Sequence, residues 1–180
     1  MKKSKNIAII GTGRVGSAVA FALLFSKAKI NGIFLDDDNI RKKEGEFRDL
    51  GHASILLKKK NIVFRLNNAN RSSMDAFIIC AGYARSSSKD NMDSLYRKNL
   101  SVVQNILDKL NVKERQKVFI VTNPADRLAK FFSISIIPCG SLLDAARYNS
   151  DGKDGGYILD RKGYTNWGIA AEVLKRIERI

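Results

Sequence analysis

The sequence lacks several features on which other classes of protein depend. No apolar run approaches the roughly 20 residues that cross a bilayer, and the opening segment, MKKSKNIAII, meets a glycine loop before a signal-peptide hydrophobic region could develop. The two cysteines, Cys80 and Cys139, share no CxxC spacing, so neither a disulfide framework nor a zinc site is indicated. We therefore expect a cytoplasmic protein with buried free thiols, no metal site and no membrane partner.

Acidic residues are scarce beside basic ones, 18 against 32, which gives a net charge of +14. Such a charge suits binding to phosphate-rich polymers or to acidic membrane surfaces. The basic residues, however, are scattered from Lys2 to Arg179 and form a run only at residues 58–60. We favour compositional drift as the explanation and do not expect a nucleic-acid partner, while RNA or DNA binding stays open as a weaker alternative.

The pattern of apolar residues predicts alternating strands and helices. Hydrophobic residues make up 44% of the 180 residues, which is the balance of a globular protein. Between most of the short aliphatic runs lie stretches with apolar residues three and four apart. The expected strands are 7–10, 32–36, 61–66, 76–82, 117–122 and 134–138, and the expected helices are 15–26, 40–50 and 95–110. This alternation predicts an α/β protein with a parallel sheet covered on both faces.

The character of the sequence changes after the sixth expected strand. A short helix, LLDAARY, is followed by residues 150–156, SDGKDGG, which contain no apolar residue and predict a break. We expect a brief strand at residues 157–159 and an amphipathic helix at residues 166–180, whose apolar stripe includes Val173 and Ile177. We therefore divide the chain after residue 149.

Residues 11–16, GTGRVG, directly follow an expected strand and precede an expected helix, which is the context that gives this glycine pattern its value. Gly11 permits the tight turn, Gly13 lets the backbone approach a pyrophosphate closely, and Gly16 lets the helix pack on the strand. The amides at the start of the helix attract phosphates. The pattern predicts a doubly wound Rossmann domain that binds a dinucleotide through Gly11, Thr12, Gly13, Arg14, Val15 and Gly16.

An acidic residue ends the second expected strand. Asp36 stands at the distance where a carboxylate accepts hydrogen bonds from the adenosine ribose. Because a carboxylate there would repel a ribose phosphate, the pattern favours NAD over NADP. Asp37, Asp38 and the basic residues 41–43 leave this choice open.

Eight local motifs, taken together and in order, resemble the NAD-dependent lactate and malate dehydrogenases over nearly the whole chain. They are GTGRVG, the acidic end of GIFLD, EGEFRDLGHAS, ICAGYAR, LYRKN, VTNPAD, LLDAAR and KGYTNWGIA. The resemblance implies an NAD-binding Rossmann domain at residues 1–149 and a remnant of the C-terminal substrate domain at residues 150–180. It also implies oxidoreductase chemistry on a small 2-hydroxy or 2-oxo acid.

By position, the resemblance puts Val121 and Asn123 beside the nicotinamide, with Asn123 donating to the substrate oxygen and Asn99 near the cofactor. LLDAAR resembles the segment that holds the substrate carboxylate, with Arg147 as a bidentate clamp. Asp144 is then the acid that orients a catalytic histidine. Each of these interpretations has a plainer alternative. Asn123 could belong to a turn that ends a strand, and Asn99 could be a surface residue. Asp144 and Arg147 could form an i, i+3 ion pair on a helix.

Arg85 matches the arginine that pairs with the second carboxylate of malate-type substrates, so the resemblance favours malate slightly over lactate. The following loop, residues 86–93, departs from the family pattern. Asn91 or Met92 stands where a second arginine is expected on this closing loop. Polarisation of the substrate carbonyl by that second arginine is therefore not expected here.

The sequence contains one histidine, His52. It lies in DLGHAS, where the family has a structural histidine, so we interpret it as a packing or capping residue. The family's catalytic histidine would follow Tyr148, but the sequence passes at once to YILDRKGYTNWG, and loss of a general base costs about 10²–10⁴-fold in rate. We expect an NAD-binding protein with impaired hydride transfer; the alternative is a non-catalytic module that binds NAD or forms homo-oligomers.

Overall fold

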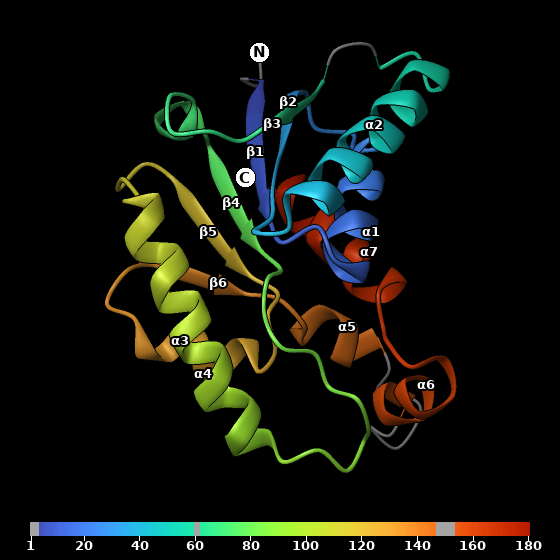
Figure 1. Ribbon diagram of the computed structural model, residues 1–180, viewed down its shortest axis with the longest axis vertical. Coiled ribbons are helices and arrows are strands. Elements are labelled where there is room, and N and C mark those ends of the chain that lie inside the picture. The colour runs from blue at the N-terminus through green and yellow to red at the C-terminus, as the bar shows by residue number, and fades with distance from the viewer. Residues whose placement is uncertain (1–3, 60–61, 147–153) are drawn as a thin grey trace.

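The computed structural model describes residues 4–59, 62–146 and 154–180 (Figure 1). Six parallel strands form one sheet in the order β3-β2-β1-β4-β5-β6. They are β1 (Lys5–Ile10), β2 (Ile30–Asp36), β3 (Val63–Arg65), β4 (Ala76–Ile79), β5 (Lys117–Ile120) and β6 (Ile136–Pro138). The order reverses between β1 and β4, so the crevice where doubly wound sheets bind ligands lies at the carboxyl ends of these two strands. The predicted α/β Rossmann sheet is confirmed.

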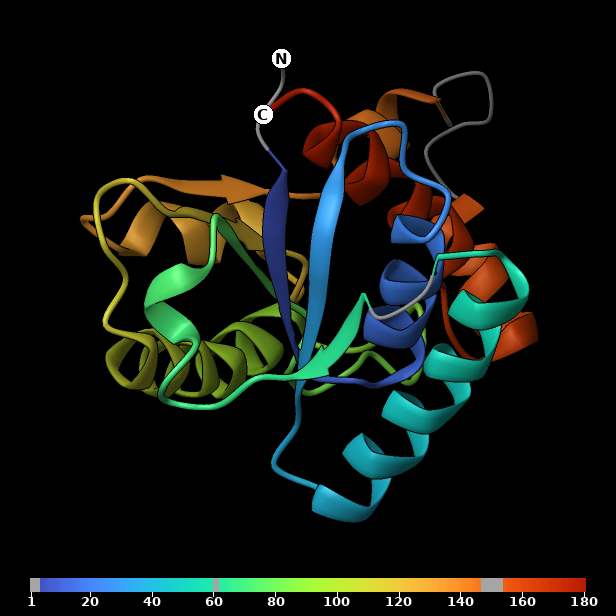
Figure 2. The ribbon, with the colours of Figure 1, turned by 90° about the horizontal axis from the view of Figure 1, so that it is seen from above.

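Helices cover both faces of the sheet (Figure 2). One face carries α1 (Arg14–Leu23), α2 (Ile40–Leu56) and α7 (Trp167–Ile177), and the other carries α3 (Met92–Leu110) and α4 (Ala125–Phe131). The short helices α5 (Ser141–Ala146) and α6 (Asp154–Lys162) lie beyond the carboxyl ends of the strands, and a 3-10 turn spans Arg71–Ser73. Asparagine side chains cap two of the long helices, because Asn39 precedes α2 and Asn91 precedes α3, and each accepts hydrogen bonds from first-turn amides.

Alternate side chains of the central strand β1 enter two different cores. Ile7 and Ile9 pack on the face covered by α1 and α7, whereas Ala8 and Ile10 pack on the opposite face. Val173 of α7 is fully buried in the same core as Ile7 and Ile9. The predicted amphipathic C-terminal helix is therefore confirmed, and its apolar stripe docks on α1.

One prediction of secondary structure is wrong, and one helix was not predicted. Residues 157–159, expected as a strand, lie inside α6, and the sequence analysis gave no helix at the position of α4. A three-residue strand without a neighbouring strand would leave its backbone amides and carbonyls unpaired, whereas a helix pairs them internally. The seven residues of α4 are too few to display a helical period. The expected domain boundary after residue 149 lies outside the described residues.

Within the described ranges, no helix combines the length and the apolar character needed to cross a membrane. The same ranges contain no group of three or more histidine, cysteine or acidic side chains able to hold a metal ion. Both thiols are free, with Cys139 buried and Cys80 half-buried. Burial raises the pKa of Cys139 to about 12, and burial followed by the proximity of Cys139 also raises the pKa of Cys80. Both thiols are therefore poor nucleophiles.

Candidate functional site

A cleft of about 900 Å³ lies at the carboxyl edge of the sheet. Its walls come from the glycine loop, from the segments that follow β4, β5 and β6, and from α6 and the link between α6 and α7. A parallel sheet brings these loops together because all of its strands end at the same edge. Of the site residues expected from the sequence, the cleft is lined by Gly13, Arg14, Val15, Arg85, Val121, Asn123 and Asp144.

The three glycines of the loop differ in what surrounds them. Gly11 has φ of +93°, and a Cβ there would lie 2.5 Å from the Ala81 amide nitrogen. A Cβ on Gly16 would lie 1.9 Å from the carbonyl oxygen of Gly11, so this glycine permits the close packing of α1 on β1. Gly13 has an ordinary φ of −71°, and a Cβ there would meet only the Lys42 ammonium, at 3.6 Å. The backbone at Gly13 therefore faces open space.

The start of α1 is suited to an anion. Gly13 is the residue that precedes the helix, and it supplies no side-chain cap to the first amides of α1. The first turn also contains no acidic residue. Uncapped amides and the positive end of the helix dipole attract phosphate, and the Arg14 side chain is exposed beside them.

Two neighbouring aspartates at the end of β2 have different partners. Asp36 accepts a hydrogen bond from the ammonium of Lys43 at 3.1 Å. Asp37 reaches the glycine loop, where its Oδ2 accepts from the amide of Thr12 at 2.7 Å and from the Thr12 hydroxyl at 3.0 Å. Of the two, Asp37 is therefore the carboxylate that contacts the glycine loop, and the expected contact of Asp36 with the adenosine ribose stays a prediction.

The surroundings of Asp37 keep it ionised. Burial alone would raise the pKa of this carboxyl, but the amides of Asn39 and Thr12, the Thr12 hydroxyl and the Lys42 ammonium outweigh burial and hold its pKa below 3.8. Its side chain is 14% exposed. A fixed, ionised and partly accessible carboxylate is a suitable acceptor for hydroxyl groups.

Asn99 connects the two loops at the back of the cleft. Its amide nitrogen donates to the carbonyl oxygens of Asn123 at 2.7 Å and Tyr83 at 3.0 Å, and its carbonyl accepts from the Tyr83 amide at 2.7 Å. The side chain is 0% exposed. Asn99 therefore positions the loops after β4 and β5, and its expected contact with a cofactor stays a prediction.

The loop after β4 carries Arg85 into the cleft wall. The Arg85 Nη2 donates to the carbonyl of Ser88 at 2.8 Å, whereas its Nε is buried and has no hydrogen-bond partner among the described residues. Asp160 of α6 accepts from the amide and the hydroxyl of Ser88 at 2.9 and 2.6 Å, which ties this loop to α6. A buried guanidinium nitrogen without a partner is the kind of group that a carboxylate ligand satisfies.

The remaining expected residues fall in different places. Asp144 lies on α5 at the cleft, and Arg147 lies outside the described residues. Tyr164 of the link before α7 also lines the cleft, and the Arg14 guanidinium lies 4.5 Å from its ring centroid. His52 is exposed inside α2, away from its ends, and does not line the cleft, so the prediction that it is a packing or capping residue is wrong.

The comparison with protein families decides the relationship. The family model described as lactate/malate dehydrogenase, NAD binding domain, matches residues 5–137. The chain belongs to this family. The resemblance that the eight motifs indicated is therefore confirmed.

Curated relatives of this lactate/malate dehydrogenase family member include L-lactate dehydrogenases. That of Bacillus caldotenax is 31% identical over 154 residues, covering 81% of this chain and 48% of that protein. That of Moorella thermoacetica is 35% identical over 149 residues, covering 79% of this chain and 46% of that protein. The chain thus spans about half the length of the curated relatives that it matches.

Solved structures share the fold of this family member. Malate dehydrogenase from Archaeoglobus fulgidus in complex with NADH has a TM-score of 0.79 at 21% identity, covering 97% of this chain and 77% of that one. The minor L-lactate dehydrogenase of Enterococcus mundtii has a TM-score of 0.80 at 18% identity, with the same coverage. The structural likeness extends beyond residues 5–137, which the family model matches, because coverage of 97% of this chain reaches the later part that holds α6 and α7.

Glu172 of α7 is a structural residue of this family member that the sequence analysis missed. Its side chain is 1% exposed and accepts hydrogen bonds from the amides of Gly140 and Leu143, at 2.8 and 2.9 Å, at the start of α5. Arg176 donates to the same carboxylate at 2.8 Å. The carboxylate therefore holds α5, which carries Asp144, against α7. The sequence analysis did not single out Glu172, because an acidic residue of an amphipathic helix usually lies on the solvated face.

We expect Glu172→Gln to lower the free energy of unfolding by about 2 kcal/mol at neutral pH, since hydrogen bonds to a charged group are worth about 1.5–3 kcal/mol. Burial would raise the pKa of Glu172, but the Gly140 amide, Arg176 and the Leu143 amide outweigh it and hold the pKa below 4.5. The stabilisation is therefore present above pH 4.5 and is lost as the pH falls through the lowered folded pKa. Urea unfolding at several pH values checks this.

The exposed Glu114 provides the control, because Glu114→Gln changes the net charge equally without touching a buried carboxylate. The stability difference between Glu172→Gln and the unmodified protein should shrink as the pH falls below 4.5 and through the lowered pKa of folded Glu172. A difference that stays constant down to acid pH would show that the carboxylate charge is not what holds α5.

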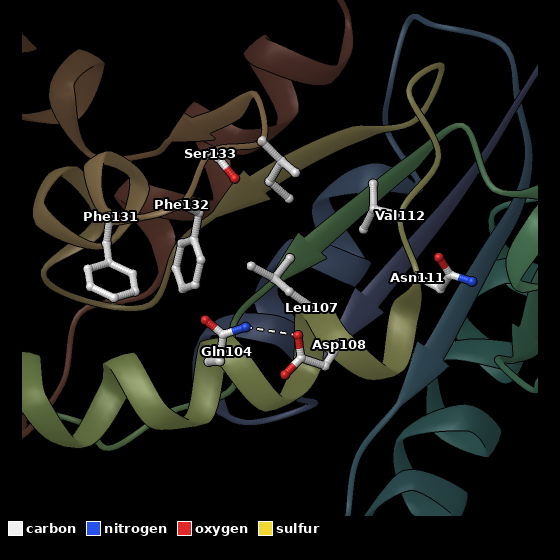
Figure 3. Close-up of a pocket in the computed structure, with 9 residues that line it drawn as sticks. Gln104, Leu107, Asp108, Asn111, Val112, Phe131, Phe132 and Ser133 are labelled. Atoms are coloured by element: carbon white, nitrogen blue, oxygen red, sulfur yellow. Dashed lines mark hydrogen bonds between the residues drawn. The ribbon is translucent and has the colours of Figure 1, made fainter.

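A smaller hollow of about 520 Å³ lies between the end of α3 and the segment after α4 (Figure 3). Gln104 donates to Asp108 at 2.8 Å on its α3 side, and Phe131 and Phe132 line the opposite side. None of the site residues expected from the sequence lines it. The larger cleft is therefore the candidate functional site.

Proposed function

We propose that the chain binds NAD in the larger cleft. The observation that carries this proposal is the uncapped start of α1 at Gly13 with the Asp37 carboxylate held beside it. The amides of the first turn suit the pyrophosphate. Asp36 stays the proposed acceptor for the hydroxyls of the adenosine ribose, and Asp37, held against the glycine loop, is a second carboxylate suited to the same hydroxyls. Membership of a family defined by its NAD-binding domain supports the same cofactor. Val121 and Asn123 line the same cleft and are the proposed residues beside the nicotinamide.

We propose further that residues 1–149 are the NAD-binding domain and residues 150–180 a remnant of the substrate domain. The family match ends at residue 137, which supports a division after that point. In the described part of the second segment, α6 closes one side of the cleft through Asp160, and α7 packs on α1. The remnant thus contributes a wall to the cofactor cleft.

The proposed substrate is a small 2-hydroxy or 2-oxo acid, with malate favoured over lactate. The unpartnered Nε of Arg85 supports a second carboxylate at this wall. Asn123 is exposed at the same cleft and is the proposed donor to the substrate oxygen. Arg147 remains the proposed clamp for the first carboxylate.

NAD, when bound, supplies the hydride acceptor for oxidation of a hydroxy acid. The protein must then remove a hydroxyl proton, and the residues that line the cleft include no histidine. Asp144 is proposed as the acid that would orient such a histidine, and the one histidine of the sequence, His52, is not among the residues that line the cleft. We therefore propose that the chain holds cofactor and has impaired hydride transfer.

A titration with NADH tests the cofactor proposal. Energy transfer from Trp167, which follows the cleft residues 163–165, should produce saturable NADH emission. The midpoint of thermal unfolding should rise as well, since a ligand at 100 times its dissociation constant adds about 2.7 kcal/mol of stability. Neither saturation nor a thermal shift at millimolar NADH would contradict the proposal.

A second candidate is a module that associates with another copy of itself. Phe21 and Phe25 of the α1 region are 42% and 53% exposed and form an edge-to-face pair at 5.3 Å. Leu56 at the end of α2 is 84% exposed. Exposed aromatic and aliphatic side chains of this size support a homo-oligomer. This association is compatible with NAD binding, because none of the three lines the cleft.

A further inference from the structure

Lys42 lies over the glycine loop although it belongs to the first turn of α2. Its ammonium is 3.7 Å from the Oδ2 of Asp37, and a Cβ built on Gly13 would meet the same ammonium at 3.6 Å. The space in front of Gly13 is the space that this glycine leaves open for a pyrophosphate. A partly exposed cation therefore lies at the edge of the position expected for two phosphate groups.

We propose that Lys42 is a pyrophosphate-binding residue of the cofactor site. On binding, its ammonium leaves Asp37 and pairs with the pyrophosphate, so that the Oδ2 of Asp37 is freed of one partner as the ribose arrives. This inference rests on the proposed NAD binding and adds a residue to it. Neither the glycine pattern nor the spacing of the acidic residue points to Lys42.

The partners of Asp37 allow this exchange. Without Lys42, the carboxylate still accepts from the Thr12 amide and hydroxyl and from the Asn39 amide at 2.9 Å. Lys42 itself is 40% exposed, so its side chain has room to move. The pyrophosphate carries two negative charges and is the stronger partner for a lysine, which binds phosphate as a point charge.

Lys43 provides a matched control on the same helix. Its ammonium is 3.1 Å from Asp36 and its side chain is only 18% exposed. Lys43→Met removes the same charge as Lys42→Met from the neighbouring residue. Among the described residues the Lys43 ammonium pairs with Asp36 and makes no hydrogen bond or ion pair to the glycine loop. A general effect of net charge on anion binding would appear equally in both variants.

The test measures dissociation constants of NADH, ADP-ribose and adenosine by titration calorimetry for the unmodified protein, Lys42→Met, Lys42→Arg and Lys43→Met. Lys42→Met should raise the dissociation constants of NADH and ADP-ribose by about 10-fold, while that of adenosine should change by less than about 2-fold. Lys42→Arg should restore most of the affinity, because the positive charge is kept. Lys43→Met should stay within about 2-fold of the unmodified protein for all three ligands.

Several outcomes overturn the proposal. An equal loss of affinity for adenosine would show that Lys42 acts on the ribose through Asp37. An unchanged affinity for NADH would show that Lys42 does not contribute to cofactor binding. If the unmodified protein binds none of the dinucleotides, the proposed function itself fails, a result that is distinct from each of these.

Discussion

Gly13→Ala should weaken NADH binding by about 100-fold while the free energy of unfolding falls by only about 1 kcal/mol, the cost of replacing glycine by alanine at the residue that precedes a helix. Gly13 has an ordinary φ of −71°, and an added Cβ would be 3.6 Å from the Lys42 ammonium, so the folded protein accepts a methyl group there. The bound pyrophosphate does not, because the second glycine of the loop is where the backbone must approach it. Overpacking of the added methyl group against the pyrophosphate should cost about 1–3 kcal/mol, which corresponds to a loss of NADH affinity of up to about 100-fold.

The neighbouring glycines sharpen this experiment. Gly16→Ala would test folding instead of binding, since its Cβ would lie 1.9 Å from the Gly11 carbonyl oxygen. Gly45→Ala is the control, because a Cβ on this α2 glycine would have no neighbour within 4 Å. Gly45→Ala should bind NADH normally and unfold at slightly higher urea concentration. Normal NADH binding by Gly13→Ala would mean that no pyrophosphate approaches this loop.

Reduction of oxaloacetate or pyruvate by NADH should be about 10²–10⁴-fold slower with this chain than with a full-length relative, the effect expected for loss of the general acid–base group. The one histidine, His52, is exposed on α2 and is not among the residues that line the cleft. Asp144 does line the cleft, but a carboxylate that orients a histidine does not replace it.

Loss of NADH absorbance measures this rate, with the L-lactate dehydrogenase of Bacillus caldotenax assayed beside it as the reference. Single-turnover conditions at saturating NADH separate slow chemistry from weak cofactor binding. Turnover close to that of the reference enzyme would contradict the prediction and would require a base other than histidine. Assays of oxaloacetate and pyruvate in parallel also show which of the two acids is preferred by the cleft that Arg85 lines.

The alternation of aliphatic runs and helical stretches was sufficient to predict the parallel sheet, because strand and helix periods are local properties of the sequence. The glycine loop was predicted for the same reason, since its function depends on a turn within a few residues. The strand expected at residues 157–159 failed because a strand needs a neighbour to pair with, and the sequence contains no information about whether a sheet edge is near. The structure has α6 there instead.

The choice between adjacent aspartates also exceeded what spacing can decide. Asp36 and Asp37 differ by one position, and successive side chains at the end of a strand point to opposite faces. The Lys43 ammonium, from the next helix, pairs with the Asp36 carboxylate, and the Thr12 amide, from a loop 25 residues earlier, donates to the Asp37 carboxylate. The family resemblance put Asn99 near the cofactor, and the structure adds that its buried side chain joins the loops after β4 and β5.

The sequence by itself determined the α/β class, the position of the glycine loop and the family, because each rests on local patterns read in order along the chain. Only the tertiary structure decided which aspartate contacts that loop, that Lys42 lies over Gly13, and that Glu172 holds α5 against α7. These contacts depend on side-chain direction and on the packing of distant helices at the carboxyl edge of the sheet, and neither is encoded in the spacing of residues.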